Sequence, residues 1–267
     1  MENKSGSSSF RMAVPAEFEE VFTHFYISGN NTGETIHKTF LPSFQTMMVF
    51  SFGSEVSFRS DMGNRIQVGK CIILGPVKQS FGYEMPSGAE ILVANFRDDA
   101  FYRFFGQLPS AGQTPIEPDG LHRGNCFTEL WYLLKGIDPD GRVPLILDFC
   151  RPYLKDRESA FGEIMPYRDA SAAFNPIKVI AKATKQSERT IQLNHRKYLG
   201  YTAKEISRYR RFLKAVDLLQ NDLARANWFE IIDACGYYDQ SQLIHDFKHY
   251  LHLSPKQYLK FHQDVCR

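Results

Sequence analysis

Residues 231–261, IIDACGYYDQSQLIHDFKHYLHLSPKQYLKF, contain three short helical segments separated by signals that end or begin a helix. Gly236 is suited to end the first helix, since glycine readily takes the left-handed backbone found there, and Asp239 is placed to cap the second. Ser254 followed by Pro255 is typical of the start of another helix. A helix, a tight turn and a polar, cationic helix is the plan of a helix-turn-helix unit.

The same plan occurs upstream. A helix is predicted over residues 176–185, and a second begins at Ser187 and ends at Gly200. The amphipathic stretch 202–222, TAKEISRYRRFLKAVDLLQND, predicts a long helix between the two units. About 19 helical residues span about 28 Å, which is close to one turn of B-DNA, about 34 Å. Two recognition helices at this separation can enter successive major-groove segments on one face of a duplex.

Residues 231–261 resemble the second helix-turn-helix and tail of AraC/XylS-type bacterial transcription regulators. The positions that match the family pattern are Ile232, Gly236, Tyr237, Asp239, Ser241, Phe247, Lys248, Ser254, Pro255 and Tyr258. The resemblance covers about residues 157–262, and in the first unit it is carried by Ala181, Ser187, Ile191, Lys197 and Gly200. It implies a DNA-binding regulator that activates transcription more often than it represses it, with RNA polymerase as a partner.

Several positions depart from the family pattern. His252 replaces the usual glycine before Ser-Pro, so that a non-glycine residue must make the left-handed cap or the cap must relax. Thr184 and His195 stand where the first unit usually has Leu and Phe, and Leu193 and His245 replace arginines. His195 is either a hydrogen-bonded core histidine, or the first unit is loosely packed and contributes little to binding.

The resemblance also implies which side chains contact DNA. The candidates for reading bases are Arg189 and Gln192 in the first recognition helix, and Gln240, Gln242 and His245 in the second. Glutamine can bond both N6 and N7 of adenine, and arginine can bond O6 and N7 of guanine. The candidates for phosphate contact are Arg196, Lys197, Arg208, Arg210, Arg211, Lys248 and His249. The alternative is that these residues only form a solvated helix face.

The distribution of charge agrees with a polyanion partner for one part of the chain. Residues 1–174 hold 16 Lys and Arg against 21 Asp and Glu, whereas residues 175–267 hold 16 against 9, although the net charge of the whole chain is only +2. A basic C-terminal part suggests nucleic acid. Charge alone leaves a solvated basic surface equally open.

The N-terminal part has the pattern of strands. Short apolar or alternating runs separated by Gly, Pro, Asn and Asp occur at residues 39–53, 55–60, 64–76 and 89–96. Turn signals at 60–64 and 85–88 predict two hairpins. This spacing favours an antiparallel sandwich or small barrel, and the segments LPSFQTMMVFSFG and IILGPVKQSF loosely resemble the cupin-like sensory domains that precede the module in one AraC subgroup.

Two helices are predicted after these strands. The first follows Asp98 or Asp99 as its N-cap and ends before Gly106. The second lies within residues 125–136, where one apolar face is formed by Phe127, Leu130, Trp131 and Leu134. This spacing predicts core or dimer packing for Trp131 and not a ligand site.

The predicted fold class is therefore α+β and multidomain, with an N-terminal antiparallel β-sandwich or barrel of cupin-like type followed by an all-α domain with two helix-turn-helix units. We expect a disordered leader over residues 1–15, a sensory or dimerisation domain over 16–137, a helical linker over 138–156 and the DNA-binding domain over 157–267.

The sequence offers little for catalysis. Its five cysteines are scattered and form no C-x-x-C pair, and the first 174 residues hold only His24, His37 and His122, with no H-x-H pair. It has neither a G-x-S-x-G motif nor a P-loop. We therefore expect no enzyme activity, no cofactor and no metal site.

The sequence has no apolar run of the length that a membrane helix needs, and the N-terminus lacks the apolar core of a secretory signal. No membrane association is expected, and the cytoplasm is the predicted location.

The predicted function is sequence-specific binding of double-stranded DNA by a transcription regulator, with an effector of unknown identity or a homodimer contact in the N-terminal domain. The alternative is a small-molecule-binding or protein-interaction protein whose degenerate first unit no longer reads DNA.

Overall fold

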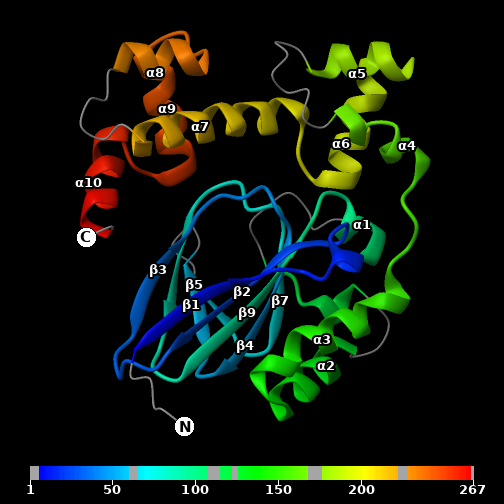
Figure 1. The fold of residues 1–267 in the computed structure, drawn as a ribbon, viewed down its shortest axis with the longest axis vertical. Helices are drawn as coiled ribbons and strands as arrows, with labels where there is room; N and C mark the ends of the chain where they lie inside the picture. The colour runs from blue at the N-terminus through cyan, green and yellow to red at the C-terminus, as the bar shows by residue number, and fades with distance from the viewer. Residues whose placement is uncertain are drawn as a thin grey trace.

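The computed structural model describes residues 6–59, 65–106, 115–121, 126–167, 176–221 and 228–265. A β-rich half and a helical half are stacked along the long axis of the molecule (Figure 1). The predicted order, an antiparallel β part followed by an all-α part, is confirmed.

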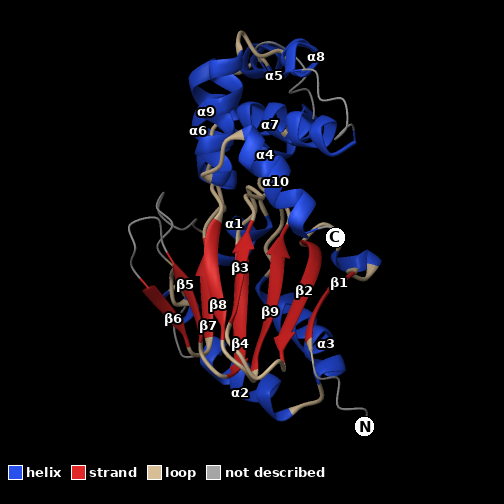
Figure 2. Ribbon diagram, turned by 90° about the vertical axis from the view of Figure 1, so that its left-hand side faces the viewer, coloured by secondary structure: helices blue, strands red, loops and turns tan. Residues whose placement is uncertain are grey.

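The β-rich half is a sandwich of two antiparallel sheets (Figure 2). One sheet has the order β1-β2-β9-β4-β7 and the other the order β3-β8-β5-β6. The strands are β1 (Ser7–Met12), β2 (Phe22–Asn30), β3 (Ile36–Phe40), β4 (Met47–Gly53), β5 (Val56–Arg59), β6 (Arg65–Val68), β7 (Cys71–Leu74), β8 (Phe81–Met85) and β9 (Ala89–Phe96).

Three details of the predicted β half are wrong. Residues 7–12 of the expected disordered leader form β1, which pairs with β2 along its whole length although its side chains are mostly exposed. The run 39–53 is interrupted, because Pro42 and its neighbours form a loop between β3 and β4. The turn at 85–88 does not close a hairpin: β8 and β9 belong to different sheets, so the turn carries the chain across the sandwich.

The other predicted hairpin is present. Arg59 of β5 pairs with Arg65 of β6, and residues 60–64 between them lie outside the described residues.

Helices cover the outer face of the five-stranded sheet. They are α1 (Ala100–Phe105), α2 (Cys126–Gly136) and α3 (Pro139–Cys150). The whole predicted apolar face of α2 is buried, and the Trp131 indole Nε1 donates a hydrogen bond of 2.7 Å to the Ser51 carbonyl oxygen, so its core role is confirmed. Val143 and Ile146 of α3 are buried in the same cluster. The segment expected to be a linker therefore belongs to the core of the β-rich half.

The helical half contains the two predicted units. Its helices are α4 (Ser159–Gly162), α5 (Pro176–Thr184), α6 (Glu188–Leu199), α7 (Ala203–Asn221), α8 (Trp228–Cys235), α9 (Gln240–Leu251) and α10 (Pro255–Val265). α5 and α6 form the first helix-turn-helix, α8 and α9 form the second, and α7 runs between them (Figure 1).

The predicted helix ends are confirmed. The side chains of Ser187 and Asp239 accept backbone hydrogen bonds at the starts of α6 and α9. Gly200 and Gly236 have left-handed φ angles of 75° and 71°. His252 also takes the left-handed cap, with φ 58°, so the cap survives without the family's glycine.

One aromatic side chain of the sandwich enters the core of the second unit. Phe44, in the loop between β3 and β4, is 6% exposed. Its ring stacks on Tyr209 with the centroids 4.5 Å apart and meets Tyr201 and Tyr250 edge-on. The Tyr209 hydroxyl donates a hydrogen bond to the Pro42 carbonyl oxygen. The loop therefore acts as part of the hydrophobic core of the helical half.

The segment before β8 reinforces this contact. The Ser80 backbone N–H donates to the Tyr250 carbonyl oxygen at 2.8 Å, at the C-terminal end of α9. Lys78 forms an ion pair with Glu205 of α7, with 2.7 Å between Nζ and Oε1. The two halves are thus joined by buried aromatic packing as well as by polar contacts.

We predict that Phe44→Ala lowers the free energy of unfolding by about 3–5 kcal/mol, as is usual for loss of a buried phenyl ring. Urea unfolding followed by fluorescence measures it. The control is Phe10→Ala, because Phe10 is 50% exposed in β1. Equal effects of the two substitutions would contradict a core role for Phe44.

Candidate nucleic-acid interface

The second helix of each unit, α6 and α9, is held against α7 or its first residues. Ile191 of α6 packs with Ala203 at the start of α7, and Phe247 of α9 meets Phe212 of α7 edge-on with the ring centroids 5.0 Å apart. The 19 residues of α7 span about 28 Å at 1.5 Å per residue. The predicted length of the connecting helix is confirmed.

The outward face of α6 carries three of the sequence candidates. Ile191, Tyr198 and Leu199 are buried. Helical spacing then leaves Arg189, Gln192, Leu193 and Arg196 exposed on the opposite side. Leu193 is 54% exposed and lies near the centre of this face. A large apolar side chain therefore stands in the middle of a cationic surface.

The outward face of α9 has Ser241, His245 and Lys248 at its centre, at spacings of four and three residues. Gln240 is also exposed, towards one side of this face. Ser241 was absent from the sequence candidates, although the spacing from His245 and Lys248 was sufficient to find it.

Gln242 is directed inward. Its side-chain oxygen accepts a hydrogen bond of 3.0 Å from the Tyr238 backbone N–H and lies 3.5 Å from Nη1 of Arg211. It therefore stabilises the turn before α9, and base reading by Gln242 stays a prediction that competes with this contact.

Two of the phosphate candidates bind a buried carboxylate. Asp246 of α9 is 1% exposed, and it accepts hydrogen bonds from Nε of Arg208 at 2.6 Å and from Nη2 of Arg211 at 2.9 Å. A buried carboxylate is stable only with such partners. Arg208 and Arg211 therefore hold α9 on α7, whatever else they contact.

Lys197 is engaged at the contact with the sandwich. Its ammonium lies 2.8 Å from Oε2 of Glu158, which also accepts hydrogen bonds from the hydroxyls of Tyr198 and Tyr102. The hydrogen bond from Lys197, followed by those from the tyrosines, lowers the pKa of Glu158 to about 2. The same carboxylate raises the pKa of Lys197. This cluster fixes the C-terminal part of α6 to α1.

The other phosphate candidates differ in exposure. Arg196 and Lys248 are exposed, whereas Arg210 is half-buried between the two halves. His249 is half-buried, with Nδ1 3.3 Å from Nε2 of Gln79, and burial lowers its pKa, with a smaller contribution from Arg208. The seven residues thus do not form one continuous surface.

His195 is a buried residue of α6. It is 6% exposed, and neither ring nitrogen has a hydrogen-bond partner among the described residues. Burial lowers its pKa to about 4, so the ring is neutral near pH 7. The interpretation of His195 as a hydrogen-bonded core histidine is therefore wrong. The first unit nevertheless has a small buried core, which includes Ile180 and Ile191.

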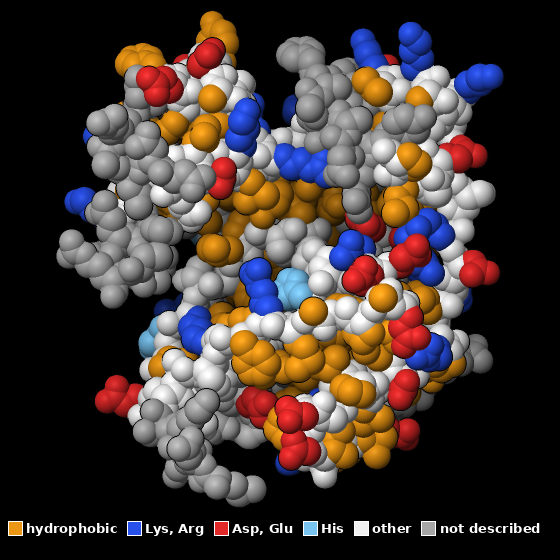
Figure 3. Space-filling view, viewed as in Figure 1, with side chains coloured by type: hydrophobic (Ala, Val, Ile, Leu, Met, Phe, Trp, Pro, Cys, Tyr) orange, Lys and Arg blue, Asp and Glu red, His pale blue; other side chains and the backbone are white. Residues whose placement is uncertain are grey.

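Lys and Arg side chains gather over the helical half on the face shown in Figure 3, and the surface is hollowed between that half and the sandwich. No helix in the described part of the chain is long and apolar enough to cross a membrane. In the same residues, no group of three or more His, Cys, Asp or Glu side chains is placed to hold a metal ion.

The family model of a helix-turn-helix domain matches residues 180–260, from α5 to α10. These residues are an AraC-type DNA-binding domain. The chain therefore carries an AraC-type domain over residues 180–260, and the match lies within the region of resemblance predicted from the sequence.

Solved structures similar to this chain include ToxT from Vibrio cholerae, at 11% identity and a TM-score of 0.45, over 95% of this chain and 97% of that chain. ToxT from Vibrio cholerae O395 aligns at 12% identity and a TM-score of 0.41, over 97% and 98%. Because these TM-scores are below 0.5, the likeness says nothing about what this protein binds. No curated protein sequence matches the chain.

We predict that Asp246→Asn destabilises the protein by about 3–5 kcal/mol, because it removes the negative charge between two partly buried guanidinium groups. Chemical denaturation measures the loss. Asp217→Asn, an exposed change of the same type on α7, should stay within about 0.5 kcal/mol of wild type. A loss of stability of similar size in both variants would show that the Asp246 carboxylate does not hold α9 against α7.

A second prediction concerns pH. His195 has a pKa of about 4 in the folded protein and about 6.5 when unfolded. Between these values the unfolded chain binds a proton that the folded chain does not, so the free energy of unfolding falls as pH falls from 6.5 towards 4. The loss from this residue is at most about 1.4 kcal/mol per pH unit.

The substitution His195→Phe removes this contribution. Urea unfolding at pH 7 and pH 5 should show a smaller loss of stability on acidification for His195→Phe than for wild type. His24 and His249 also have pKa values lowered by burial, but they are present in both proteins and cancel in the comparison. If the free energy of unfolding falls by the same amount in His195→Phe and in wild type, His195 is not a neutral, buried group in the folded protein.

Proposed function

We propose that the protein binds double-stranded DNA sequence-specifically, with α6 and α9 in two successive major-groove segments. The observation that supports this proposal is the attachment of both helices to one 19-residue helix, α7. The length of α7, about 28 Å, is suited to half-sites about one helical turn apart. A single chain can then present two recognition helices, as a dimer of simpler repressors does.

The exposed faces suggest how each helix reads bases. In α6 we assign base contacts to Arg189 and Gln192, and Leu193 is suited to pack on the methyl group of thymine. In α9 we assign them to Gln240 and His245. Arg196 and Lys248 are then the exposed cations best placed for phosphate, which gives affinity without sequence preference.

We also propose that the sandwich, near residues 16–156, regulates the DNA-binding part, near residues 157–267. It contacts both units: Tyr102 of α1 bonds to the Glu158 carboxylate that also holds Lys197 of the first unit, and Phe44 enters the core of the second. A ligand or a second copy of the chain that favours one arrangement of the sandwich would therefore shift DNA affinity. By family resemblance, the protein is a non-enzymatic activator that works with RNA polymerase in the bacterial cytoplasm.

The test is selection of binding sites from random duplexes by the purified full-length protein at two salt concentrations. We expect enrichment of a site with two boxes about one helical turn apart. One enriched box with salt-sensitive binding would make the first unit a passive clamp. No enrichment at either salt concentration would favour the alternative, a small-molecule-binding or protein-interaction protein.

Variants of the selected complex separate the two kinds of contact. Gln192→Ala and His245→Ala should each weaken binding by about 1–3 kcal/mol and relax the preference at one base pair. Lys248→Ala should weaken binding to all duplexes alike and reduce the salt slope by about 1. Lys135→Ala, on α2 of the sandwich, is the control and should change neither quantity.

A further inference from the structure

The exposed imidazole ring of His245 on α9 is held by Arg208 of α7. Nη2 of Arg208 lies 2.8 Å from Nδ1 of the ring. A guanidinium group has five N–H donors and no acceptor, so Arg208 must donate this hydrogen bond. Nδ1 of His245 is therefore the acceptor. His245 is also one of the side chains to which we assign a base contact, so the state of its ring bears on the DNA sequence that α9 can read.

Arg208 is fixed by contacts other than His245. Its Nε donates to Oδ1 of the buried Asp246 at 2.6 Å. The guanidinium carbon also lies 5.6 Å from the centre of the Tyr250 ring. One planar group thus serves Asp246 through Nε and His245 through Nη2, and a rigid fork of donors loses little freedom when it forms a second bond. Arg208 therefore orients His245 from a position that does not depend on His245.

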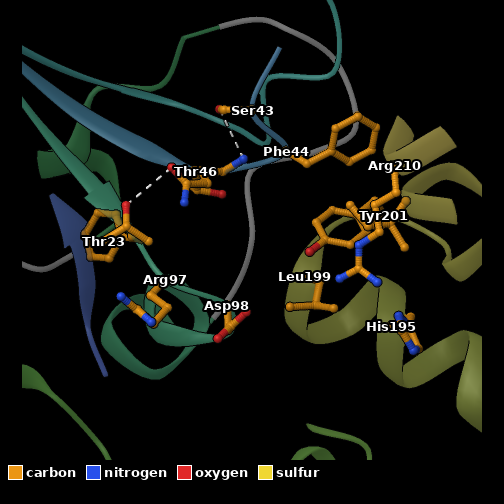
Figure 4. Close-up of a pocket in the computed structure, with 13 residues that line it drawn as sticks. Thr23, Ser43, Phe44, Thr46, Arg97, Asp98, His195, Leu199, Tyr201 and Arg210 are labelled. Atoms are coloured by element: carbon orange, nitrogen blue, oxygen red, sulfur yellow. Dashed lines mark hydrogen bonds between the residues drawn. The ribbon is translucent and has the colours of Figure 1, made fainter. Parts of the chain in front are cut away.

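The other two arginines of this run on α7 are directed elsewhere. Nη2 of Arg211 donates to Oδ2 of Asp246 at 2.9 Å, and Nη1 lies 3.5 Å from the side-chain oxygen of Gln242. Arg210 lines the cavity between the two halves, as does His195 of the first unit (Figure 4). Arg208 is therefore the arginine of this run that positions His245.

The acceptor role of Nδ1 decides where the imidazole carries its proton. In a neutral imidazole one nitrogen is the donor and the other is the acceptor, so the proton of His245 is on Nε2. A ring protonated on both nitrogens would turn an N–H group towards the guanidinium group and lose this bond. The side chain is exposed at the centre of the outward face of α9. His245 therefore offers a DNA groove one hydrogen-bond donor and no acceptor.

The base edges in the major groove differ in what they offer a single donor. Adenine and guanine both present the acceptor N7, cytosine presents its N4 amino donor, and the O4 acceptor of thymine stands beside a methyl group. An arginine binds O6 and N7 of guanine together and so selects guanine. A single donor at N7 distinguishes a purine from a pyrimidine but does not distinguish guanine from adenine.

We propose that Arg208 holds His245 as a donor from Nε2, and that His245 reads N7 of a purine in the second half-site. Arg208 is then a positioning residue, which acts on the sequence preference through the imidazole ring. The base contact rests on the proposed DNA-binding function, whereas the state of the ring does not. The expected preference at this position is for adenine or guanine, with both pyrimidines disfavoured.

The state of the ring is tested by ¹⁵N NMR of the histidine side chains in the full-length protein at pH 8. Ring nitrogens with and without a proton give well separated signals, and the signals missing from His245→Ala belong to His245. We expect the wild-type ring to carry its proton on Nε2 alone, and the ring in Arg208→Gln to exchange between both tautomers. Arg210→Gln, the same substitution two residues along α7, is the control and should leave the His245 signals unchanged.

The base contact is tested with base analogues in the selected duplex. The position read by His245 is the one whose preference is lost in His245→Ala. We expect 7-deazaadenine or 7-deazaguanine there, which replace N7 by a C–H group and keep Watson–Crick pairing, to weaken wild-type binding at least about fivefold. The same analogues should not change binding by His245→Ala. Exchange of adenine and guanine should change wild-type affinity by less than about twofold. A 7-deazapurine outside both boxes is the control.

Three results would overturn the proposal. They are a wild-type ring with its proton on Nδ1, equal wild-type binding of the natural and 7-deazapurine duplexes, and a preference of about fivefold or more for guanine over adenine, which indicates two contacts to the base. If Arg208→Gln fails to fold, as judged by circular dichroism, the wild-type ring signals and the 7-deazapurine duplexes decide.

The proposed function fails in a different way. A protein that selects no DNA site loses the DNA-binding function and the purine contact together, although its NMR spectrum still reports the ring held by Arg208. A protein that selects a site but tolerates 7-deazapurines loses the purine contact only.

Discussion

The carboxylate of Asp246, buried between Arg208 and Arg211, is the contact on which the geometry of the helical half depends. Removing a carboxylate from water costs several kcal/mol, which only close pairing with cations can offset. The stable arrangement of α9 against α7 is therefore the one in which both guanidinium groups reach the Asp246 carboxylate. Because α6 packs against the start of the same helix, this pairing also fixes the separation of the two units.

The sandwich contributes tertiary packing to the short helices of the helical half. Helices of 8 to 12 residues, such as α8 and α6, are marginal without tertiary packing. Phe44 supplies an aromatic ring to the core of the second unit, and Glu158 ties Lys197 and Tyr198 of the first unit to Tyr102 of α1. The conformation of the sandwich and the arrangement of the two units are therefore linked through packed contacts with both units.

Local features were predictable, whereas long-range pairing was not. Caps such as Ser187 and Asp239 and the buried face of α2 depend on residues within a few positions, so the sequence pattern was enough to find them. The turn at 85–88 was predictable from its residues. Which sheet β9 joins after this turn was not, because that depends on pairing with strands distant in the sequence. In the candidate site, the exposed faces followed from helical spacing. The partners of Arg208 and Arg211 did not, since Asp246 lies more than thirty residues away.

The internal ion pairs also affect which contacts can supply affinity for DNA. Lys197, Arg208 and Arg211 are each paired with a carboxylate, and a cation compensated in this way adds little to the field that attracts phosphate. The electrostatic, sequence-independent part of binding is then smaller than the basic composition of the helical half suggests. In the proposed complex, base contacts then supply a larger share of the affinity. Leu193 and His245, near the centres of the exposed faces of α6 and α9, stand where the family pattern has arginine, so the preferred DNA sequence should differ from sites read by those arginines.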